Sequence, residues 1–407
     1  MNIAYLCQYF VPEPGAPSAR LYELSRVWVE SGHNVTILTG MPNHPTGEIA
    51  AEYRGKCIAE EQLDGIRVLR NWLFATPNEG IFKKTLSHIS FMLSVLVFGM
   101  PRMGATDVLI VSSPSFFSVF SAYVISRLRR IPYIFEVRDL WPTVFVDLGI
   151  LTNPLLIRML EFWELFLYHH AARVVTVTES FRRDLIRRGV PTSNVYTVTN
   201  GAAVDKFTPG TKENSVQEEL GLAEKFVVSY VGAHGISHGL ETILHAAEHV
   251  SECKDIKFLM VGEGARKKDL LTLKNELQLD NVIMLPAQAS ARIAEYYKAS
   301  DVCIVPLRNV PFFETFIPSK MFEIMACGVP IIGAVRGEAR SILERSGAAK
   351  LVEPEDVGAL VAAICQMQKD PDARESMGLA GREFVLAYYN RSVLAGQYLE
   401  LLKRVVH

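Results

Sequence analysis

Hydrophobic and polar positions follow two alternating rhythms along the chain. Short, nearly continuous apolar runs, such as residues 107–113 (DVLIVSS) and 256–264 (IKFLMVGEG), indicate strands that are buried on both faces. Longer segments with apolar residues at helical spacing lie between these runs. Buried strands that alternate with amphipathic helices predict parallel sheets with crossover helices, which is an α/β fold.

The same rhythm occurs twice. In the first half, strands are expected at 2–10, 33–40, 107–113, 132–139, 173–180 and 195–201, with a hairpin at 57–72. In the second half, strands are expected at 226–233, 256–264, 281–287, 301–307 and 330–335, and 372–407 is expected to be helical. Because a polar segment with Gly and Pro (200–215) separates the halves, we predict two doubly wound, Rossmann-like domains that face each other across a cleft. Their expected bounds are 1–203 and 204–385, and a C-terminal helix, 386–407, is expected to pack back on the first domain.

Composition removes several classes of function. The 407 residues carry a net charge of -2, so no basic field favours nucleic acid as a partner. The six Cys residues are scattered and show no metal-binding spacing, which fits reduced thiols in the cytoplasm. No motif for a metal or a bound cofactor is present, so we expect neither. Ligands of doubly wound folds bind at the carboxyl ends of the strands.

Three glycine-containing loops follow predicted strands, at 12–20, 231–239 and 261–268. Glycine permits a close approach of the backbone, and a following helix offers N–H groups to an anion such as a diphosphate. The alternative is that these are simple strand-to-helix connections with exposed polar residues. The candidate ligand-binding residues in these loops are Gly15, Arg20, Gly232, Gly235, His238, Glu263 and Gly264.

The stretch FETFIPSKMFEIMACGVP (313–330) places a Lys and a Glu next to an apolar, small-residue run. Pro318 suits the first turn of a helix, and Ser319, Lys320 and Glu323 follow within two turns. An i, i+3 ion pair alone contributes only a few tenths of a kcal/mol, about 0.2–0.5. Because a lone buried charge is costly, Lys320 and Glu323 are expected to serve a diphosphate and sugar hydroxyls.

A second polar group follows the strand at 132–139, in the sequence FEVRDLWP. Glu136, Arg138, Asp139 and Trp141 there suit acid–base chemistry and stacking on a sugar. A structural network of Arg138 with Glu136 or Asp139 is the alternative. His44, in a similar loop at 41–47, is a further candidate polar contact.

The segment Ile81–Met103 comes closest to a membrane element. It is apolar in the middle, with Lys83 and Lys84 at one end and Arg102 at the other, but it is too short in uninterrupted apolar residues to span a bilayer. It is either a helix buried in a large domain or a helix that contacts a membrane surface through basic flanks.

These motifs together resemble the retaining, nucleotide-sugar-dependent glycosyltransferases of family 4. The resemblance covers nearly the whole chain and is carried by an ordered set of segments. Within the family the chain is most similar to bacterial surface-polysaccharide enzymes (O-antigen and capsule), including N-acetyl-fucosamine-type transferases. The matching segments are 31–39, 200–209, 231–247, 258–264, 299–307 and 318–332, together with RDLWP at 138–142.

The resemblance implies a GT-B fold and a metal-independent transfer that retains the anomeric configuration of the donor. The expected donor is a UDP-linked, N-acetylated deoxyhexosamine held mainly by the second domain, with Glu323 on the ribose hydroxyls and the base between Pro286 and Ile293. The expected acceptor is a polyprenyl-diphosphate-linked saccharide bound by the first domain, at the cytoplasmic face of the cell membrane. Acceptor contacts would come from His44, Glu136, Arg138 and Trp141.

The sequence also departs from the family pattern. The usual Arg and Lys after the first strand of the second domain fall at Ala233 and His238, and the usual first Glu of a paired motif falls at Thr315. We therefore expect Lys320 and Arg20, with His238 and the Gly235 backbone, to neutralise the leaving diphosphate, and Asp139 to activate or orient the acceptor. A non-hydrolysing UDP-sugar 2-epimerase and a non-catalytic sugar-nucleotide-binding assembly protein are the alternatives.

Overall fold

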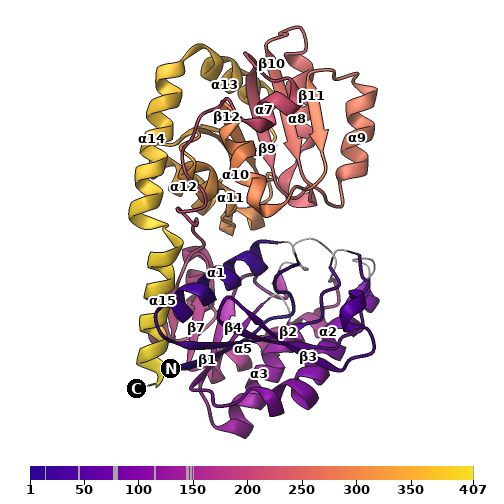
Figure 1. The fold of residues 1–407 in the computed structure, drawn as a ribbon, viewed down its shortest axis with the longest axis vertical. Helices are drawn as coiled ribbons and strands as arrows, with labels where there is room; N and C mark the ends of the chain where they lie inside the picture. Colours follow the sequence, from indigo (N-terminus) through magenta and orange to yellow (C-terminus); the bar gives the residue numbers. More distant parts are fainter. Residues whose placement is uncertain are drawn as a thin grey trace. The chain divides into compact units, whose positions relative to one another are not determined.

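The structure is a computed structural model that describes residues 1–13, 15–44, 46–76, 81–113, 116–143, 146, 149 and 151–406. The chain divides into two compact units, each with its own sheet (Figure 1). Unit 1 is Met1–Thr199 with Arg391–His407, and unit 2 is Asn200–Asn390. The divisions therefore fall at Thr199 and Arg391, a few residues from the expected bounds at 203 and 386.

Unit 1 contains an eight-stranded sheet in the order β3-β4-β2-β1-β5-β6-β7-β8. All neighbours are parallel except β3 and β4, which form the expected hairpin. The apolar runs form these strands because helices cover both faces of the sheet. The strands are β1 (Asn2–Leu6), β2 (Asn34–Gly40), β3 (Ile58–Leu63), β4 (Ile66–Asn71), β5 (Val108–Ser112), β6 (Tyr133–Val137), β7 (Arg173–Thr176) and β8 (Val195–Thr197).

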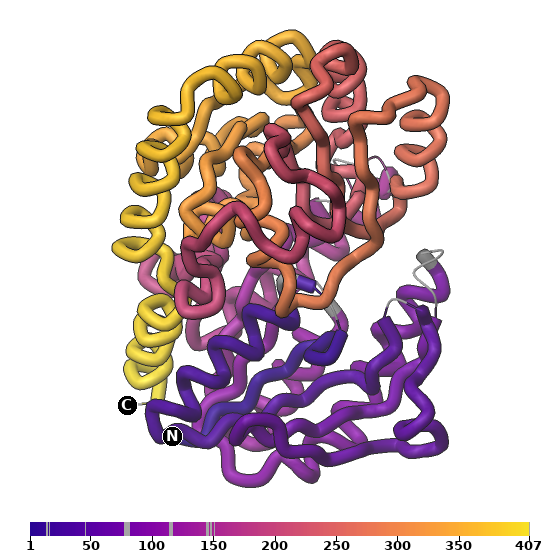
Figure 2. The backbone as a smooth tube through the Cα atoms, turned by 45° about the horizontal axis from the view of Figure 1, so that its top comes forward, coloured from indigo at the N-terminus to yellow at the C-terminus, as the bar shows by residue number. Residues whose placement is uncertain are grey.

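One face of this sheet is covered by α1 and α15, which come from opposite ends of the chain and lie side by side in both views (Figures 1 and 2). The indole N–H of Trp28 donates to the Ala395 carbonyl at 3.0 Å, and Tyr398 packs edge-on against Trp28. The C-terminal helix thus belongs to the core of unit 1. The helices in the described part of unit 1 are α1 (Ala16–Glu30), α2 (Ile81–Ser94), α3 (Phe116–Arg129), α5 (Pro154–His170), α6 (Glu179–Arg187) and α15 (Arg391–Val406).

The opposite face is covered by α2, α3 and α5. Tyr123 of α3 contacts Phe166 of α5 with ring centroids 5.3 Å apart, and Ser121 of α3 donates to the Met92 carbonyl of α2 at 3.1 Å. The apolar segment Ile81–Met103 is not one helix: α2 is followed by the π-helical turn η2 (Val95–Gly99) and the 3-10 turn η3 (Met100–Arg102). Among the described residues, no helix has the length and apolar character needed to cross a membrane.

Unit 2 contains a six-stranded parallel sheet in the order β11-β10-β9-β12-β13-β14. Its strands are β9 (Phe226–Val231), β10 (Ile256–Val261), β11 (Val282–Leu285), β12 (Val302–Pro306), β13 (Ile331–Ala334) and β14 (Ala349–Val352). Its helices are α7 (Ser215–Leu220), α8 (Glu241–His249), α9 (Lys267–Glu276), α10 (Ile293–Lys298), α11 (Lys320–Ala326), α12 (Gly337–Ser346), α13 (Val357–Lys369) and α14 (Pro371–Tyr388). The sequence from 372 to 407, expected to be helical, is interrupted at Tyr389 and Asn390, where the chain passes from unit 2 to unit 1. The two-domain α/β architecture predicted from the sequence is confirmed.

Candidate functional site

The strongest polar cluster of unit 2 lies at the carboxyl ends of β9, β10 and β12, where a parallel sheet places its ligands. Two glycine loops meet there backbone to backbone: the N–H of Gly232 donates to the Val261 carbonyl at 2.9 Å, and the N–H of His234 donates to the Glu263 carbonyl at 2.8 Å. A Cβ on Gly262 would lie 1.9 Å from the Gly232 carbonyl oxygen. Glycine is therefore required at position 262 by close packing of the backbone.

Lys320 is the central cation of this cluster. Its ammonium group is buried and forms no hydrogen bond with the residues that the structure describes. It lies 3.8 Å from the centroid of the Tyr230 ring, and a Cβ on Gly232 would come within 2.4 Å of the Nζ atom. Desolvation lowers the pKa of Lys320 to about 7, although the Glu323 carboxylate opposes the shift. A ring face alone does not offset the cost of removing an ammonium group from water.

Glu323 lies one turn further along α11 but forms no ion pair with Lys320 in the described structure. The Tyr297 hydroxyl donates to its Oε2 atom at 3.3 Å. Desolvation raises the pKa of the Glu323 carboxyl to about 7, against the hydrogen bond from Tyr297 and the charges of Lys206 and Lys320. The pKa values of Glu323 and Lys320 thus both lie near 7, and each side chain can still bind a further polar group.

His234 is a third unsatisfied side chain, and we did not single it out from the sequence. It is 0% exposed, and neither ring nitrogen has a partner among the described residues. Desolvation, with Lys267 and Lys320 nearby, lowers its pKa to about 4, so the imidazole is neutral at physiological pH. The sequence signal for it is its position between two glycines in VGAHG, at the carboxyl end of β9.

The other predicted residues of this cluster are more completely bonded or more exposed. The imidazole of His238 is uncharged at neutral pH, because desolvation lowers its pKa to about 3. Its Nδ1 atom lies 3.3 Å from the Pro306 carbonyl oxygen. Gly235 caps the short turn η5 (Ile236–His238). Lys267, which is not among the candidate residues from the sequence, donates to the carbonyls of Gly262 and Leu285 at 2.9 and 2.6 Å. These contacts fix the loop ends around the Lys320 ammonium.

The remaining predicted residues of unit 2 lie at the same end of the sheet or on α10 and α11. The Glu263 side chain and Gly264 are exposed, and a Cβ on Gly264 would meet the His234 backbone at 2.6 Å. Pro286 is exposed directly after β11, Ile293 begins α10, and Ser319 caps α11 after Pro318. Their roles in binding a base or a diphosphate remain predictions.

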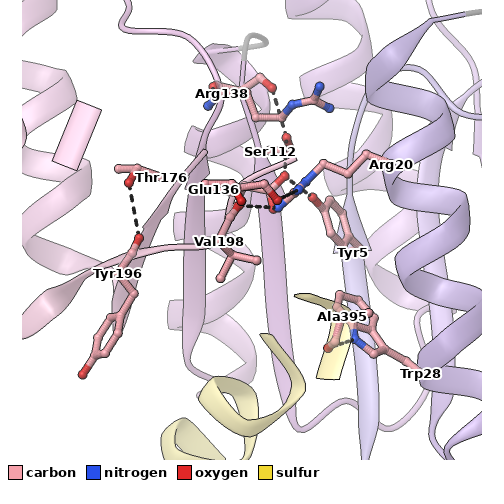
Figure 3. Close-up of polar contacts among 12 residues, drawn as sticks. Tyr5, Arg20, Trp28, Ser112, Glu136, Arg138, Thr176, Tyr196, Val198 and Ala395 are labelled. Atoms are coloured by element: carbon pink, nitrogen blue, oxygen red, sulfur yellow. Dashed lines mark hydrogen bonds and ion pairs between the residues drawn. The ribbon is translucent and has the colours of Figure 1, made fainter. Parts of the chain in front are cut away.

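Unit 1 contains a buried acid–base pair of a different kind. The Arg20 guanidinium donates to Glu136 at 3.3 Å and to the carbonyls of Thr199 and Val198 at 2.7 and 2.9 Å (Figure 3). Glu136 is 0% exposed and also accepts from the hydroxyls of Tyr5 at 2.7 Å and Ser112 at 3.3 Å. Despite desolvation, the nearby charges of Arg20 and Arg138 leave the pKa of Glu136 below its usual value.

These contacts do not favour the predicted ligand roles of Arg20 and Glu136. The Glu136 carboxylate accepts hydrogen bonds from several sides. The hydrogen bonds of Arg20 connect α1 with β6 and with the residues that follow β8. The partner of Glu136 is also different from the alternative considered from the sequence, which was Arg138. Gly15 lies directly before α1 with a φ of 140°, a conformation that favours glycine, and is exposed.

Of the other predicted residues of unit 1, Arg138 and His44 each line a cavity. Arg138 lines one of about 190 Å³, together with residues from β1, α1 and β5. His44 lines another of about 310 Å³, and its backbone N–H donates to the buried Glu13 carboxylate at 2.9 Å. Asp139 follows Arg138, and desolvation raises its pKa to about 6, opposed by the Arg138 charge. Trp141 is partly exposed, two residues further on.

Comparison with known proteins connects both units to one class of enzyme. Residues 15–201 match the model "Glycosyl transferase 4-like domain", and residues 212–384 match the model "Glycosyl transferases group 1". The chain is 24% identical over 345 residues to WcaI of Escherichia coli (strain K12), which is assigned to colanic acid biosynthesis as a glycosyl transferase. That similarity covers 82% of this chain and 84% of WcaI.

Solved structures share the fold at low sequence identity. Sucrose-phosphate synthase from Thermosynechococcus elongatus superposes with a TM-score of 0.76 at 21% identity and covers 99% of this chain and 98% of its own. HepE from Anabaena, in complex with UDP and glucose, gives a TM-score of 0.75 at 15% identity and covers 99% of this chain and 100% of its own. The chain therefore belongs to the glycosyltransferases of the GT-B fold, with a glycosyl transferase 4-like domain followed by a glycosyl transferases group 1 domain.

Proposed function

We propose that this glycosyltransferase moves a sugar from a UDP-linked donor to a lipid-linked saccharide acceptor in surface-polysaccharide biosynthesis, with retention of the donor's anomeric configuration. The observation that carries the proposal is the unsatisfied cluster of Lys320, Glu323 and His234 at the strand ends of the group 1 domain. A nucleoside diphosphate has the complementary groups, because it offers diphosphate oxygens to an ammonium and ribose hydroxyls to a carboxylate.

In this proposal the side chains of unit 2 act on the leaving group. Lys320 neutralises the diphosphate as the bond between its oxygen and the anomeric carbon breaks, which replaces the metal ion used by other transferases. The neutral His238 and the Gly235 backbone add hydrogen bonds, and Glu323 accepts hydrogen bonds from the ribose hydroxyls. Because Lys320 has no competing acid partner in the described structure, its charge remains available to the leaving diphosphate.

The acceptor hydroxyl attacks the anomeric carbon from the face that the diphosphate leaves. Its proton passes to an oxygen of the departing diphosphate, so that the products are the glycosylated acceptor and UDP. Asp139 orients the acceptor or shares its proton; a carboxyl group with a pKa of about 6 is suited to exchange protons near neutrality. An N-acetylated deoxyhexosamine is the proposed sugar, and an O-antigen or capsular polysaccharide is the proposed product.

The membrane part of the proposal rests on the helical layer of α2, α3 and α5. Phe82 of α2 is 82% exposed and Leu155 of α5 is 79% exposed. Residues 81–130 contain six Lys and Arg and one acidic residue, Asp107, although the whole chain has a net charge of -2. In the α2 and α3 part of this layer, apolar side chains with basic neighbours suit an anionic lipid surface, and α5 extends the apolar part. The large exposed apolar side chains of this layer are Phe82, Leu86, Leu93, Val97, Phe120, Leu128, Leu155, Leu156, Met159, Phe162 and Trp163.

Vesicle flotation tests this surface. Phe162→Ser should reduce binding to vesicles that contain phosphatidylglycerol, with little binding of either protein to phosphatidylcholine alone. Leu379→Ser on α14 is the matched control, because Leu379 and Phe162 are 62% and 63% exposed. Equal flotation of the wild type and Phe162→Ser would contradict this part of the proposal.

The activity is tested by measuring UDP released from UDP-sugars with and without a synthetic polyprenyl-diphosphate saccharide. Release that requires the lipid acceptor, and a product with the donor's anomeric configuration by NMR, would support the proposal. Equal turnover with soluble sugars would contradict the lipid-linked acceptor. Conversion of the UDP-sugar by the enzyme alone would instead indicate the epimerase.

A further inference from the structure

The cavity of about 190 Å³ in unit 1 has its own electrostatic character. It opens where β1, β5 and β6 end and is lined by Tyr5, Cys7, Tyr9, Ser112, Ser113 and Arg138, among others. Desolvation raises the pKa values of Cys7 and Tyr9 to about 12 and also raises that of Tyr5, so these three groups are neutral at physiological pH. Arg138 is therefore the one ionised side chain that lines the described part of this cavity.

The positive charge of Arg138 is not cancelled by Glu136, although the two residues are only two positions apart. Glu136 is already neutralised by Arg20 and accepts further hydrogen bonds from Tyr5 and Ser112. The Asp139 carboxyl, one residue further on, also interacts electrostatically with Arg138, but the two side chains form no ion pair in the described structure. Figure 3 shows the Arg138 guanidinium pointing away from the Arg20–Glu136 pair. No hydrogen bond or ion pair to this guanidinium is formed by the described residues.

The backbone around Arg138 is fixed by a second lining residue. The Ser113 hydroxyl oxygen accepts from the N–H groups of Arg138 at 2.8 Å and Asp139 at 3.3 Å. With both contacts made to its oxygen, the hydroxyl of Ser113 can still donate its own hydrogen. A guanidinium and a hydroxyl donor that line one cavity match an oxyanion, since a guanidinium can bind two oxygens of a phosphate or carboxylate at once.

We infer that this cavity binds an oxyanion of the acceptor, held by Arg138 and Ser113. That the oxyanion belongs to the acceptor rests on the proposed function. That the cavity prefers an anion rests on the side chains that line it. The oxyanion has two sources in a lipid-linked saccharide: the diphosphate of the carrier and the carboxylate of a uronic acid residue. Either places a negative group against Arg138 in the unit that is not proposed to hold the donor.

The experiment compares Arg138→Gln and Arg138→Lys with the wild type. Arg138→Gln should raise the acceptor KM about 10- to 100-fold, as expected for loss of a hydrogen-bonded charge, and leave donor affinity unchanged. Arg138→Lys keeps the charge and should recover part of the loss, which a purely structural role would not predict. Equal urea midpoints for the variants and the wild type exclude misfolding as the cause.

Two acceptor pairs distinguish the sources. If the diphosphate is bound, the KM penalty of Arg138→Gln should disappear for the same saccharide on a neutral lipid. If a uronate is bound, the penalty should disappear when its carboxylate is converted to the methyl ester. A wild-type KM for Arg138→Gln with every anionic acceptor would overturn the inference.

The inference can also fail or stand separately from the proposed function. Inorganic pyrophosphate titrated into the wild type should occupy one site more than in Arg138→Gln, whether or not any transfer occurs. The same number of sites in both proteins would contradict an oxyanion site at Arg138. Absence of turnover in the wild type, together with this difference, would reject the proposed acceptor reaction and retain the anion site.

Discussion

Unit 1 and unit 2 each bury a base and an acid, and the two pairs differ in how completely the protein satisfies them. In unit 1, Arg20 and Glu136 are bonded to each other and to surrounding carbonyl and hydroxyl groups. In unit 2, among the residues that the structure describes, Lys320 has only the face of the Tyr230 ring, and Glu323 has one hydrogen bond from Tyr297. Burial costs both pairs the hydration of their charges, but only in the first pair do contacts within the unit compensate that cost.

The difference separates a structural role from a ligand-binding role. A compensated pair keeps its ordinary charge states: the pKa of Glu136 lies below its usual value. In an uncompensated pair, desolvation shifts both pKa values toward the uncharged forms, and those of Lys320 and Glu323 both lie at about 7. A charged ligand that completes the second pair would restore its charges, so the binding energy of the ligand offsets a cost that the empty site carries.

Arg20→Met should have the largest effect, because it leaves the Glu136 carboxylate buried without its cation. We expect the free energy of unfolding to fall by about 3–5 kcal/mol, measured by urea denaturation. Arg20→Met combined with Glu136→Gln should recover much of this loss, since the uncompensated charge is removed. Wild-type stability of Arg20→Met would show that the pair contributes nothing structural.

Lys320→Met should have the opposite signature. Turnover should fall about 10²- to 10³-fold, as when one preorganised donor to a developing charge is removed. The ligand-free protein should become more stable, because the folded pKa of about 7 lies below the unfolded value of about 10.5 and the ammonium therefore destabilises the fold. This gain should be greatest below pH 7 and vanish as the pH approaches 10.5. A loss of stability like that of Arg20→Met would mean that Lys320 is already compensated.

Glu323→Gln should weaken the binding of UDP about 10- to 100-fold, since a carboxylate that accepts hydrogen bonds contributes about 1.5–3 kcal/mol. Calorimetric titration measures the change. Glu276→Gln, at an exposed position of α9, is the control that should leave the affinity unchanged. If both variants bind UDP equally well, Glu323 is a structural residue like Glu136.

Gly232→Ala should have a smaller effect that acts through Lys320. The added Cβ would lie 2.4 Å from the Nζ atom at a φ of 148°, so the ammonium must shift without losing its charge. A cost of about 1–2 kcal/mol corresponds to a roughly tenfold loss of turnover. Gly358→Ala, in helix α13, is the control, because its nearest contact is 3.6 Å away. Unchanged turnover in Gly232→Ala would show that the position of the ammonium is not critical.

Local patterns in the sequence predicted the strands and helices well, because a parallel sheet covered on both faces leaves continuous apolar runs. The interruption at Tyr389 and Asn390 was missed, since both flanking helices have the same periodicity and only the passage between units separates them. The change from α-helix to a π-helical turn after Ser94, within the segment Ile81–Met103, was likewise not visible from composition.

The sites were less predictable, because partners come from distant parts of the chain. Arg20 was predicted to meet a ligand, but its partner Glu136 lies 116 residues away in the sequence and 3.3 Å away in the structure. Lys320 and Glu323 were recognised from their apolar neighbours, whereas the only local signal of His234, its position between Gly232 and Gly235, does not show that its ring is buried without a partner. Tyr230 and Tyr297 were missed for the same reason: each is a strand or helix residue whose contact with α11 arises only from packing.

The proton balance of donor binding tests the central claim most directly, that Lys320 and Glu323 form an incomplete pair that a nucleoside diphosphate completes. UDP-N-acetylglucosamine is titrated into the protein at pH 8 in two buffers with different enthalpies of ionisation. With a ligand-free pKa of about 7, Lys320 is about nine-tenths neutral at pH 8 and must take up a proton to pair with the diphosphate, whereas Glu323 is already mostly ionised. The account predicts a net uptake of about 0.8 proton at pH 8, a change to net release at pH 6 as Glu323 ionises, and no uptake at pH 8 in Lys320→Met. Binding without proton uptake at pH 8, or with the same uptake in Lys320→Met, would contradict it.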